Sequence, residues 1–169
     1  MSENKPVAFF NGQLFPETNV AISIRDRGFL YGDAVFDATR TFQGMTFKLR
    51  EHIDRLFNSL QYLRIDPRMT KEDLISWSLK VVEHNYPLLP DGQDLWVMQR
   101  ISRGLESSTI TTDPEPTILI ESHPIPFARR ANLYRDGIRL ITPSTPRIPP
   151  RFISPRAKTH NYLNLIMGE

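Results

Sequence analysis

The chain has 169 residues and no cysteine, and its 21 Lys and Arg residues nearly balance 19 Asp and Glu residues, giving a net charge of +2. The missing cysteine excludes disulfide scaffolds, thiolate zinc sites and cysteine nucleophiles, and the small net charge gives no reason to expect nucleic acid as a partner. No apolar run has the length of a membrane span and the N-terminus has no apolar signal region, so we expect a cytoplasmic protein with one domain, or one domain and part of a second.

The first part of the chain is expected to form β structure. Residues 6–10 and 13–15 are apolar stretches separated by Asn11-Gly12. This dipeptide is the strongest short signal of a hairpin, because both residues tolerate a positive φ. A second turn is predicted at Gln43-Gly44. Three further strands are predicted around it: residues 20–24, 34–42 and 45–49.

Two amphipathic helices are predicted next. In residues 51–63 the apolar side chains recur three or four positions apart, which places them on one helix face, and we expect Asp66-Pro67 to end this helix. The second helix is expected to begin at Thr70, because Asp73 completes a capping-box pattern, and to stop before Pro87. Three more strands are predicted after it: residues 95–102, 117–122 and 138–142. Strands, two helices and strands in this order predict an α+β fold with an antiparallel sheet.

The last third of the chain has a different composition. Nine of the 14 prolines lie between Pro114 and Pro155. Residues 129–158 contain seven arginines and one lysine but a single acidic residue, Asp136. Four of the nine prolines lie between residues 142 and 154, so regular structure is not expected to continue for long there.

These changes in composition mark residues 142–154 as a proline-rich linker. A helix is predicted over 159–167. Because its apolar face opens at the end of the sequence, we expect the sequence to be the front part of a longer protein.

Lys158 is the first candidate for chemistry. It lies between the proline-rich segment and the last predicted helix, in a part of the sequence that also holds Arg147, Arg151 and Arg156. Like charges and a helix N-terminus would lower the pKa of its ammonium group, and a lysine that forms a Schiff base requires a lowered pKa. From spacing alone, a solvated lysine in a basic loop is the more economical interpretation.

Arginines are the next candidates. Arg55 lies near the start of the predicted helix 51–63, where it could join backbone N–H groups in holding a phosphate. The alternative is a surface ion pair with Glu51, four residues earlier. Arg100 and Arg103 lie at a strand end and could clamp a carboxylate, although a solvated strand edge is commoner. The four histidines share no ligand spacing, so no metal site is expected.

Three motifs resemble those of the class IV aminotransferases, which are fold type IV enzymes that use pyridoxal phosphate. The motifs are RDRGFLYGDAVFD at residues 25–37, EHIDRL at 51–56 and KTHNYL at 158–163. The family includes branched-chain aminotransferases, D-amino-acid transaminases, (R)-selective amine transaminases and aminodeoxychorismate lyases. One match would be weak, but three in the family's order across nearly the whole chain are a strong signal.

The resemblance implies roles for individual residues. Lys158 would form a Schiff base with pyridoxal 5′-phosphate and move the proton between the substrate carbon and C4′ of the cofactor, and Arg55 would bind the cofactor phosphate. Tyr31 and Phe36, which alone would be interpreted as core aromatics, would line the substrate pocket together with Ala38. The family's active site forms at a dimer interface, so a homodimer is expected. The resemblance also implies a small N-terminal α+β domain over residues 1–141, with 142–154 as the interdomain linker and 155–169 as the start of a larger, cofactor-binding domain. The sequence would then be truncated after its catalytic lysine.

The match to the family is less complete at the residues that bind substrate. D-amino-acid transaminases carry an arginine and a histidine shortly after an Arg-Gly pair, whereas residues 105–110 here read LESSTI, so that carboxylate trap is expected to be absent. Branched-chain enzymes have Glu-Gly after the motif's phenylalanine, and here Asp37 and Ala38 stand there. Arg40 fits that subgroup. We therefore keep Arg40 and Arg100 as alternative ligands for a substrate carboxylate.

The predicted function is pyridoxal-phosphate-dependent transamination of an amino acid or primary amine with a 2-keto acid. One alternative on the same scaffold is an elimination like that of aminodeoxychorismate lyase, which would release pyruvate without an amino acceptor. An alternative of another class is a non-catalytic fragment that binds no cofactor. The expected partners are the small amino donor and keto acid, with no nucleic acid and no membrane.

Overall fold

The computed structural model describes residues 5–105 and 114–169. Its centre is a six-stranded sheet in the order β2-β1-β6-β5-β3-β4, in which all neighbours are antiparallel. The strands are β1 (Val7–Phe10), β2 (Gln13–Pro16), β3 (Ala34–Phe42), β4 (Met45–Thr46), β5 (Leu95–Ser102) and β6 (Thr117–Pro124). An antiparallel sheet with helices beside it confirms the predicted α+β class.

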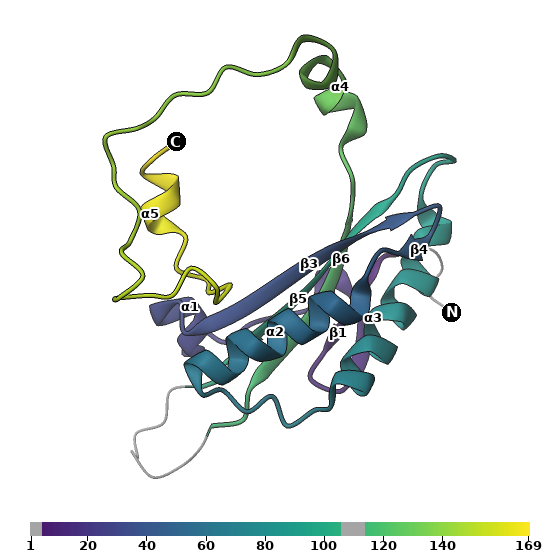
Figure 1. The fold of residues 1–169 in the computed structure, drawn as a ribbon. Coiled ribbons are helices and arrows are strands. Elements are labelled where there is room, and N and C mark those ends of the chain that lie inside the picture. Colours follow the sequence, from purple (N-terminus) through teal and green to yellow (C-terminus); the bar gives the residue numbers. More distant parts are fainter. Residues whose placement is uncertain (1–4, 106–113) are drawn as a thin grey trace.

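Two long helices lie side by side across one face of this sheet (Figure 1). The five α-helices are α1 (Arg27–Tyr31), α2 (Leu49–Leu63), α3 (Lys71–Asn85), α4 (Phe127–Asp136) and α5 (Leu163–Ile166), and two short 3-10 helices are η1 (Glu17–Asn19) and η2 (Tyr86–Leu88). The core lies between the sheet and the pair α2 and α3. Its fully buried side chains include Phe9, Val35, Ile53, Leu56, Leu74, Val97 and Ile120.

Local signals in the sequence correctly identify the turns and the start of α3. Asn11 and Gly12 have φ values of 43° and 105° between β1 and β2, and the turn at Gln43-Gly44 also has two positive φ values. Thr70 caps α3 with the predicted capping box, in which Thr70 and Asp73 bond to each other's backbone N–H groups. These features depend on neighbouring residues only.

Other predicted elements are wrong. Residues 20–24 and 138–142 form no strand, and Ile24 and Leu140 are exposed. An alternating pattern forms a strand only where another strand pairs with it, and neither segment pairs with one. Residues 127–136 form α4, which no pattern predicted because none of its side chains is buried.

The boundaries of several elements differ in part from the prediction. The strand predicted over 45–49 ends at Thr46, because Lys48 adopts a left-handed φ of 50° and α2 begins at Leu49. The predicted end of this helix at Leu63 is confirmed, although the left-handed Arg64 (φ 54°) ends it rather than Asp66-Pro67. The helix predicted over 159–167 is reduced to α5.

The C-terminal segment leaves the sheet and comes back to it. After β6 the chain runs out through α4 and an irregular stretch, then returns beside the start of β3 (Figure 1). The N–H of Phe36 donates to the C=O of Lys158 at 2.9 Å, and the N–H of His160 donates to the C=O of Ala34 at 2.9 Å. Residues 158–160 therefore extend the sheet along the edge of β3 that β5 does not occupy.

The linker predicted over residues 142–154 contains no helix or strand. The division of the chain into domains at this linker stays a prediction. Over the ranges that the structure describes, no helix is both long enough and apolar enough to cross a membrane.

His160 anchors the returning segment. Its ring lies edge-on to the ring of Phe36, with centroids 5.6 Å apart, and its Nε2 atom is buried without a hydrogen-bond partner within residues 5–105 and 114–169. Burial lowers the pKa of His160 from 6.5 to about 4, and the positive charge of Arg100 acts in the same direction. The imidazole is therefore neutral at pH 7.

Asn85 joins α3 to the sheet at a point where two strands separate. Its Oδ1 accepts from the N–H of Val7, and its Nδ2 donates to the C=O of Val7 and to Oγ of Ser122, each at 2.8 Å. Strands β1 and β6 pair only through Phe9 and Phe10. Val7 pairs with Pro16 of β2, and the amide of Asn85 takes the place of the partner that Val7 lacks on the β6 side.

We predict that Asn85→Ala lowers the free energy of unfolding by about 2 to 4 kcal/mol, because it leaves the part-buried backbone groups of Val7 and the hydroxyl of Ser122 without this partner. The matched control is Asn58→Ala, at an exposed position of α2, which should change it by less than about 0.5 kcal/mol. Urea unfolding followed by circular dichroism measures both. Equal effects of the two substitutions would contradict the assignment.

We also predict a pH dependence that comes from His160. The unfolded imidazole binds a proton below about pH 6.5, whereas the folded one does so only near pH 4, so stability falls as pH drops between these values. The full difference corresponds to about 3 kcal/mol. His160→Asn should remove this decline in urea unfolding measured from pH 7.5 to 4.5. His84→Asn, at an exposed position, should keep it, and an unchanged slope in His160→Asn would refute the prediction.

Candidate active site

Strand β3 holds the candidate site on both faces. Phe36 and Ala38 point to the face of the sheet that α2 and α3 do not cover, because side chains alternate along a strand. Asp37 points to the helices, and its side chain is 0% exposed. A buried carboxylate requires a partner, and α2 supplies it.

Arg55 forms a two-pronged ion pair with Asp37. Its Nε and Nη2 atoms lie 2.7 Å from Oδ2 and Oδ1 of the carboxylate. His52 adds its Nδ1 at 2.7 Å, and the N–H of Ala38 donates at the same distance. Yet the side chain of Arg55 is 49% exposed, and its Nη1 has no partner in the described part of the chain. One edge of the guanidinium is fixed and the other is open.

This pair stays ionised at neutral pH. Burial by itself raises the pKa of Asp37, but the hydrogen bonds from Arg55 and His52 outweigh it and the pKa lies below its usual value. The hydrogen bond to Asp37 raises the pKa of Arg55. Glu51, the alternative partner considered for Arg55, lies near Lys48 instead, at 3.9 Å. Arg55 is also more than a turn beyond the N-terminus of α2, so the first N–H groups of the helix are not beside it.

Lys158 lies beside β3 through its backbone. Its C=O accepts from Phe36, and its N–H donates to Oγ of Ser59 in α2 at 3.1 Å. The Nζ atom lies 4.1 Å from the centre of the Phe36 ring, and no carboxylate pairs with it among the residues that the structure describes. The expected position at a helix N-terminus is wrong, because α5 begins only at Leu163.

Phe36 links Lys158 to Arg100. The guanidinium carbon of Arg100 lies 5.6 Å from the ring centre, and Tyr162 contributes a second aromatic ring at 5.4 Å. A cavity of about 270 Å³ adjoins Lys158 and Tyr162 and is also lined by Arg147. Another, of about 390 Å³, adjoins Arg100 on the open face of the sheet.

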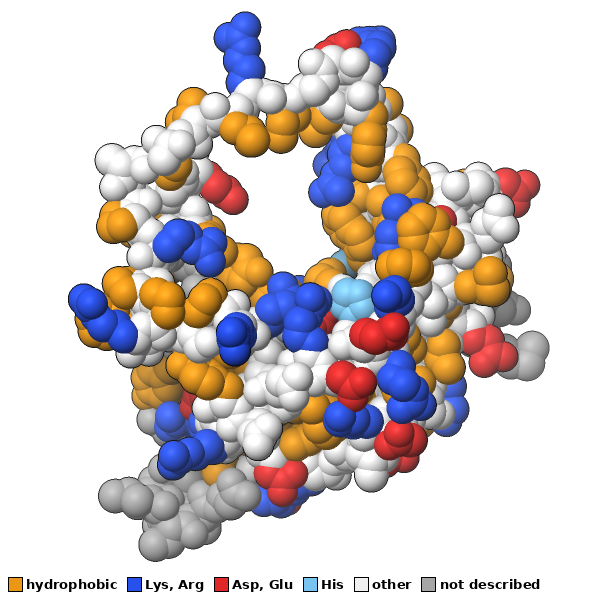
Figure 2. All heavy atoms as spheres, viewed as in Figure 1, with side chains coloured by type: hydrophobic (Ala, Val, Ile, Leu, Met, Phe, Trp, Pro, Cys, Tyr) orange, Lys and Arg blue, Asp and Glu red, His pale blue; other side chains and the backbone are white. Residues whose placement is uncertain are grey.

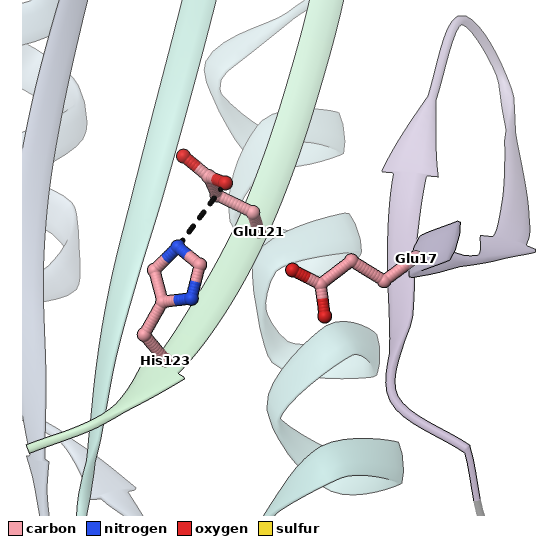
Figure 3. A group of neighbouring side chains, drawn as sticks. All are labelled: Glu17, Glu121 and His123. Atoms are coloured by element: carbon pink, nitrogen blue, oxygen red, sulfur yellow. Dashed lines mark hydrogen bonds and ion pairs between the residues drawn. The ribbon is translucent and has the colours of Figure 1, made fainter. Parts of the chain in front are cut away.

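Arg100 is held by an acid on the neighbouring strand. Its Nε donates to Oε1 of Glu121 at 2.6 Å, and the other oxygen of Glu121 lies 3.2 Å from Nε2 of His123. Figure 3 shows these two residues on β6, with Glu17 reaching toward them from η1. The ligand atoms of the three lie within 4.8 Å of one another. Because Arg100 already occupies one oxygen of Glu121, this cluster serves first to fix the guanidinium beside Phe36.

The structure brings only some of the candidate residues together. Lys158, Phe36 and Arg100 meet, and Arg55 is joined to them through Asp37. Ala38 lies on the same face as Phe36, one pair further along β3, opposite Met98.

Two candidates lie elsewhere. Arg40 is nearer the β4 end of β3, where it pairs with Asp94 at 3.4 Å and stacks on Phe42 at 3.9 Å. Tyr31 is 55% exposed on α1, with the guanidinium carbon of Arg27 at 5.3 Å from its ring centre. Most of the segment expected to lack a carboxylate trap, residues 106–110, lies outside the described residues.

The sequence patterns did not indicate the side chains that hold Arg55 and Lys158 in place. Asp37, His52 and Ser59 all touch them, and none was singled out for that role. His52 precedes Arg55 by three positions and Ser59 follows it by four, so both share its helix face, and this spacing is the signal that could have found them.

Positive side chains gather near this site. Figure 2 shows Lys and Arg side chains around the opening that the returning C-terminal segment leaves against the sheet. Arg100, Arg147 and Lys158 line the two cavities described above. This part of the surface suits an anionic ligand.

Comparisons with known proteins agree with one another. The family model described as amino-transferase class IV matches residues 34–169. A protein of Methanocaldococcus jannaschii named "Putative branched-chain-amino-acid aminotransferase" is 35% identical over 165 residues, which are 95% of this chain and 54% of that protein. The aminodeoxychorismate lyase of Bacillus subtilis is 29% identical over 92% of this chain and 51% of its own. The chain spans about half the length of the curated relatives it matches.

Solved structures share the fold. The branched-chain amino acid aminotransferase of Escherichia coli superposes with a TM-score of 0.85 at 21% identity, over 96% of this chain and 54% of its own. The branched-chain aminotransferase of Thermoproteus uzoniensis, solved with norvaline, gives 0.74 at 21% identity, over 95% of this chain and 54% of its own. The family model covers most of the chain, including β3, α2 and the segment around Lys158. The chain therefore belongs to the class IV aminotransferase family.

Proposed function

We propose that this chain holds the phosphate of pyridoxal 5′-phosphate and supplies the reactive lysine of a transaminase. The observation that carries the proposal is that the amine of Lys158, which pairs with no carboxylate of the described residues, and the half-open guanidinium of Arg55 are both tied to adjacent residues of β3. Family membership and relatives named as aminotransferases support it.

The donor set fits such a cofactor. A phosphate dianion needs N–H donors with positive charge, and the free edge of Arg55 offers them while Asp37 holds the other edge. An aldehyde needs a primary amine that no carboxylate holds in its charged form, and Lys158 meets this condition. The exposed fraction of Arg55 leaves room for a ligand to reach it.

The residues of this chain would divide the work. Pyridoxal phosphate, when bound, supplies an electron sink in its ring. Arg55 binds the phosphate and so orients the rest of the molecule. Lys158 Nζ holds and moves the proton of the reacting carbon. Phe36 covers Nζ with its ring, which restricts the access of water.

For the substrate carboxylate we propose Arg100 rather than Arg40. Arg100 and Lys158 both lie beside the Phe36 ring, at 5.6 and 4.1 Å from its centre, whereas Arg40 pairs with Asp94 further along β3. The substrates are proposed to be an amino donor, either an amino acid or a primary amine, and a 2-keto acid. The roles expected of Tyr31 and Ala38 in the substrate pocket stay predictions. The expected cytoplasmic location of the protein also stays a prediction.

We also propose that the protein acts as a homodimer. The large exposed apolar side chains of α1, Phe29 and Tyr31, suit burial against another surface. The lyase alternative is kept because the aminodeoxychorismate lyase of Bacillus subtilis aligns with 92% of this chain at 29% identity. Release of pyruvate in the absence of an amino acceptor would identify that activity.

We predict that Lys158 is the lysine that reacts with pyridoxal phosphate. With one equivalent of the cofactor followed by borohydride, peptide mass spectrometry should find the pyridoxyl label on Lys158 in large excess over Lys48 and Lys80. Both of these are exposed and serve as internal controls. An even distribution of label, or none on Lys158, would favour the non-catalytic alternative.

We predict that Arg55 provides the preference for a phosphate. In the wild-type chain, pyridoxal phosphate should label Lys158 much faster than pyridoxal, which lacks the phosphate. Arg55→Ala should reduce this ratio about thirtyfold, the equivalent of about 2 kcal/mol of charged hydrogen bonds. The control is Arg50→Ala, on the same helix, where the arginine pairs with Glu72 on the surface. A ratio that Arg55→Ala leaves unchanged would show that the phosphate binds elsewhere.

A further inference from the structure

We propose that Ser59 is a positioning residue that sets the distance between the phosphate arginine and the lysine. This inference rests on the proposed function. Ser59 lies one turn after Arg55 in α2 and is 1% exposed. Its hydroxyl donates to the C=O of Arg55 at 3.0 Å and accepts the N–H of Lys158 at 3.1 Å. It is therefore bonded to the backbones of both functional residues.

These bonds close a ring of contacts. From Ser59 the path leads to Lys158, whose C=O accepts from Phe36 at 2.9 Å. Asp37 follows Phe36 in β3 and holds the side chain of Arg55, and one turn of α2 leads from Arg55 back to Ser59. Strand, helix and lysine segment are thus connected pairwise, and none of the three can shift without breaking a bond in the ring.

Helix propensity does not explain a serine at this position. Within a helix, a serine that bonds to the carbonyl four residues earlier is slightly destabilising, and alanine would be the better helix former. The hydroxyl gains its role from its second partner, the N–H of Lys158, which would otherwise be left without an acceptor in a part-buried position.

Pyridoxal phosphate is a rigid ligand whose phosphate and aldehyde must be reached at the same time. A guanidinium and an amine that are held at one spacing meet both ends together, whereas a lysine that wanders by about 1 Å loses a large part of that advantage. Loss of the Ser59 hydroxyl should therefore lower the rate advantage that the phosphate gives to reaction at Lys158. It should change the intrinsic reactivity of the amine less.

The chain offers a matched control in Ser78. It is 0% exposed, lies in α3, and donates to the C=O of Leu74 at 2.7 Å, which is the same bond that Ser59 makes within α2. Its other partner is the side chain of Gln99 instead of Lys158. Ser78→Ala thus reproduces the loss of a buried helix hydroxyl without touching the lysine segment.

The test compares labelling by pyridoxal phosphate and by pyridoxal in the full chain. We expect Ser59→Ala to lower the ratio of the two rates at Lys158 about tenfold, and Ser78→Ala to leave it within about twofold. If Ser59→Ala retains the wild-type ratio, the inference is overturned while the proposed function stands. If the wild-type chain itself shows no preference for the phosphate, the proposed function is what fails.

A second measurement needs no cofactor, and its result on the wild-type chain alone already tests the inference. Amide hydrogen exchange of the wild-type chain should find the N–H of Lys158 protected about a hundredfold, because it is bonded to Ser59. Ser59→Ala should abolish this protection of the Lys158 N–H, whereas Ser78→Ala should leave it unchanged. Exchange of the wild-type amide at the rate of an unstructured peptide would overturn the inference even if Ser59→Ala fails to fold.

Discussion

The buried carboxylate of Asp37 is the constraint on which the site depends. A carboxylate without exposure cannot remain charged inside a protein unless cations and N–H donors surround it, and Arg55, His52 and the backbone of Ala38 supply them. Breaking the ion pair would leave the buried carboxylate of Asp37 without its main cationic partner, and this free-energy cost keeps the side chain of Arg55 in place. A surface arginine would sample many rotamers, whereas this one is held along one edge and presents the other.

Strand β3 converts this local constraint into a site. Successive side chains of a strand point to opposite faces of the sheet, so Phe36 lies on the face opposite to Asp37. There its ring contacts Lys158 and Arg100. Its open edge receives residues 158–160. Groups that lie about a hundred residues apart in the chain are therefore positioned by two consecutive residues, and a rigid strand keeps their geometry precise.

The parts of this arrangement that depend on neighbouring residues were predictable. The turn at Asn11-Gly12 and the cap at Thr70 follow from local chemistry, and the motifs singled out Arg55 and Lys158. The edge pairing of Lys158 was not predictable, because the donor to its C=O lies in β3 and the acceptor of its N–H lies in α2. Nor was α4, since a helix without a buried face has no apolar period to detect.

The pairing of the lysine segment with β3 has a consequence for solubility. An uncovered strand edge presents free N–H and C=O groups to other chains and invites aggregation. Residues 158–160 occupy such an edge, since Phe36 and Ala34 bond to them. Cleavage of the exposed proline-rich stretch before Lys158 would release this cover. The segment that carries the reactive amine is thus also what keeps the start of β3 from pairing with a neighbouring molecule.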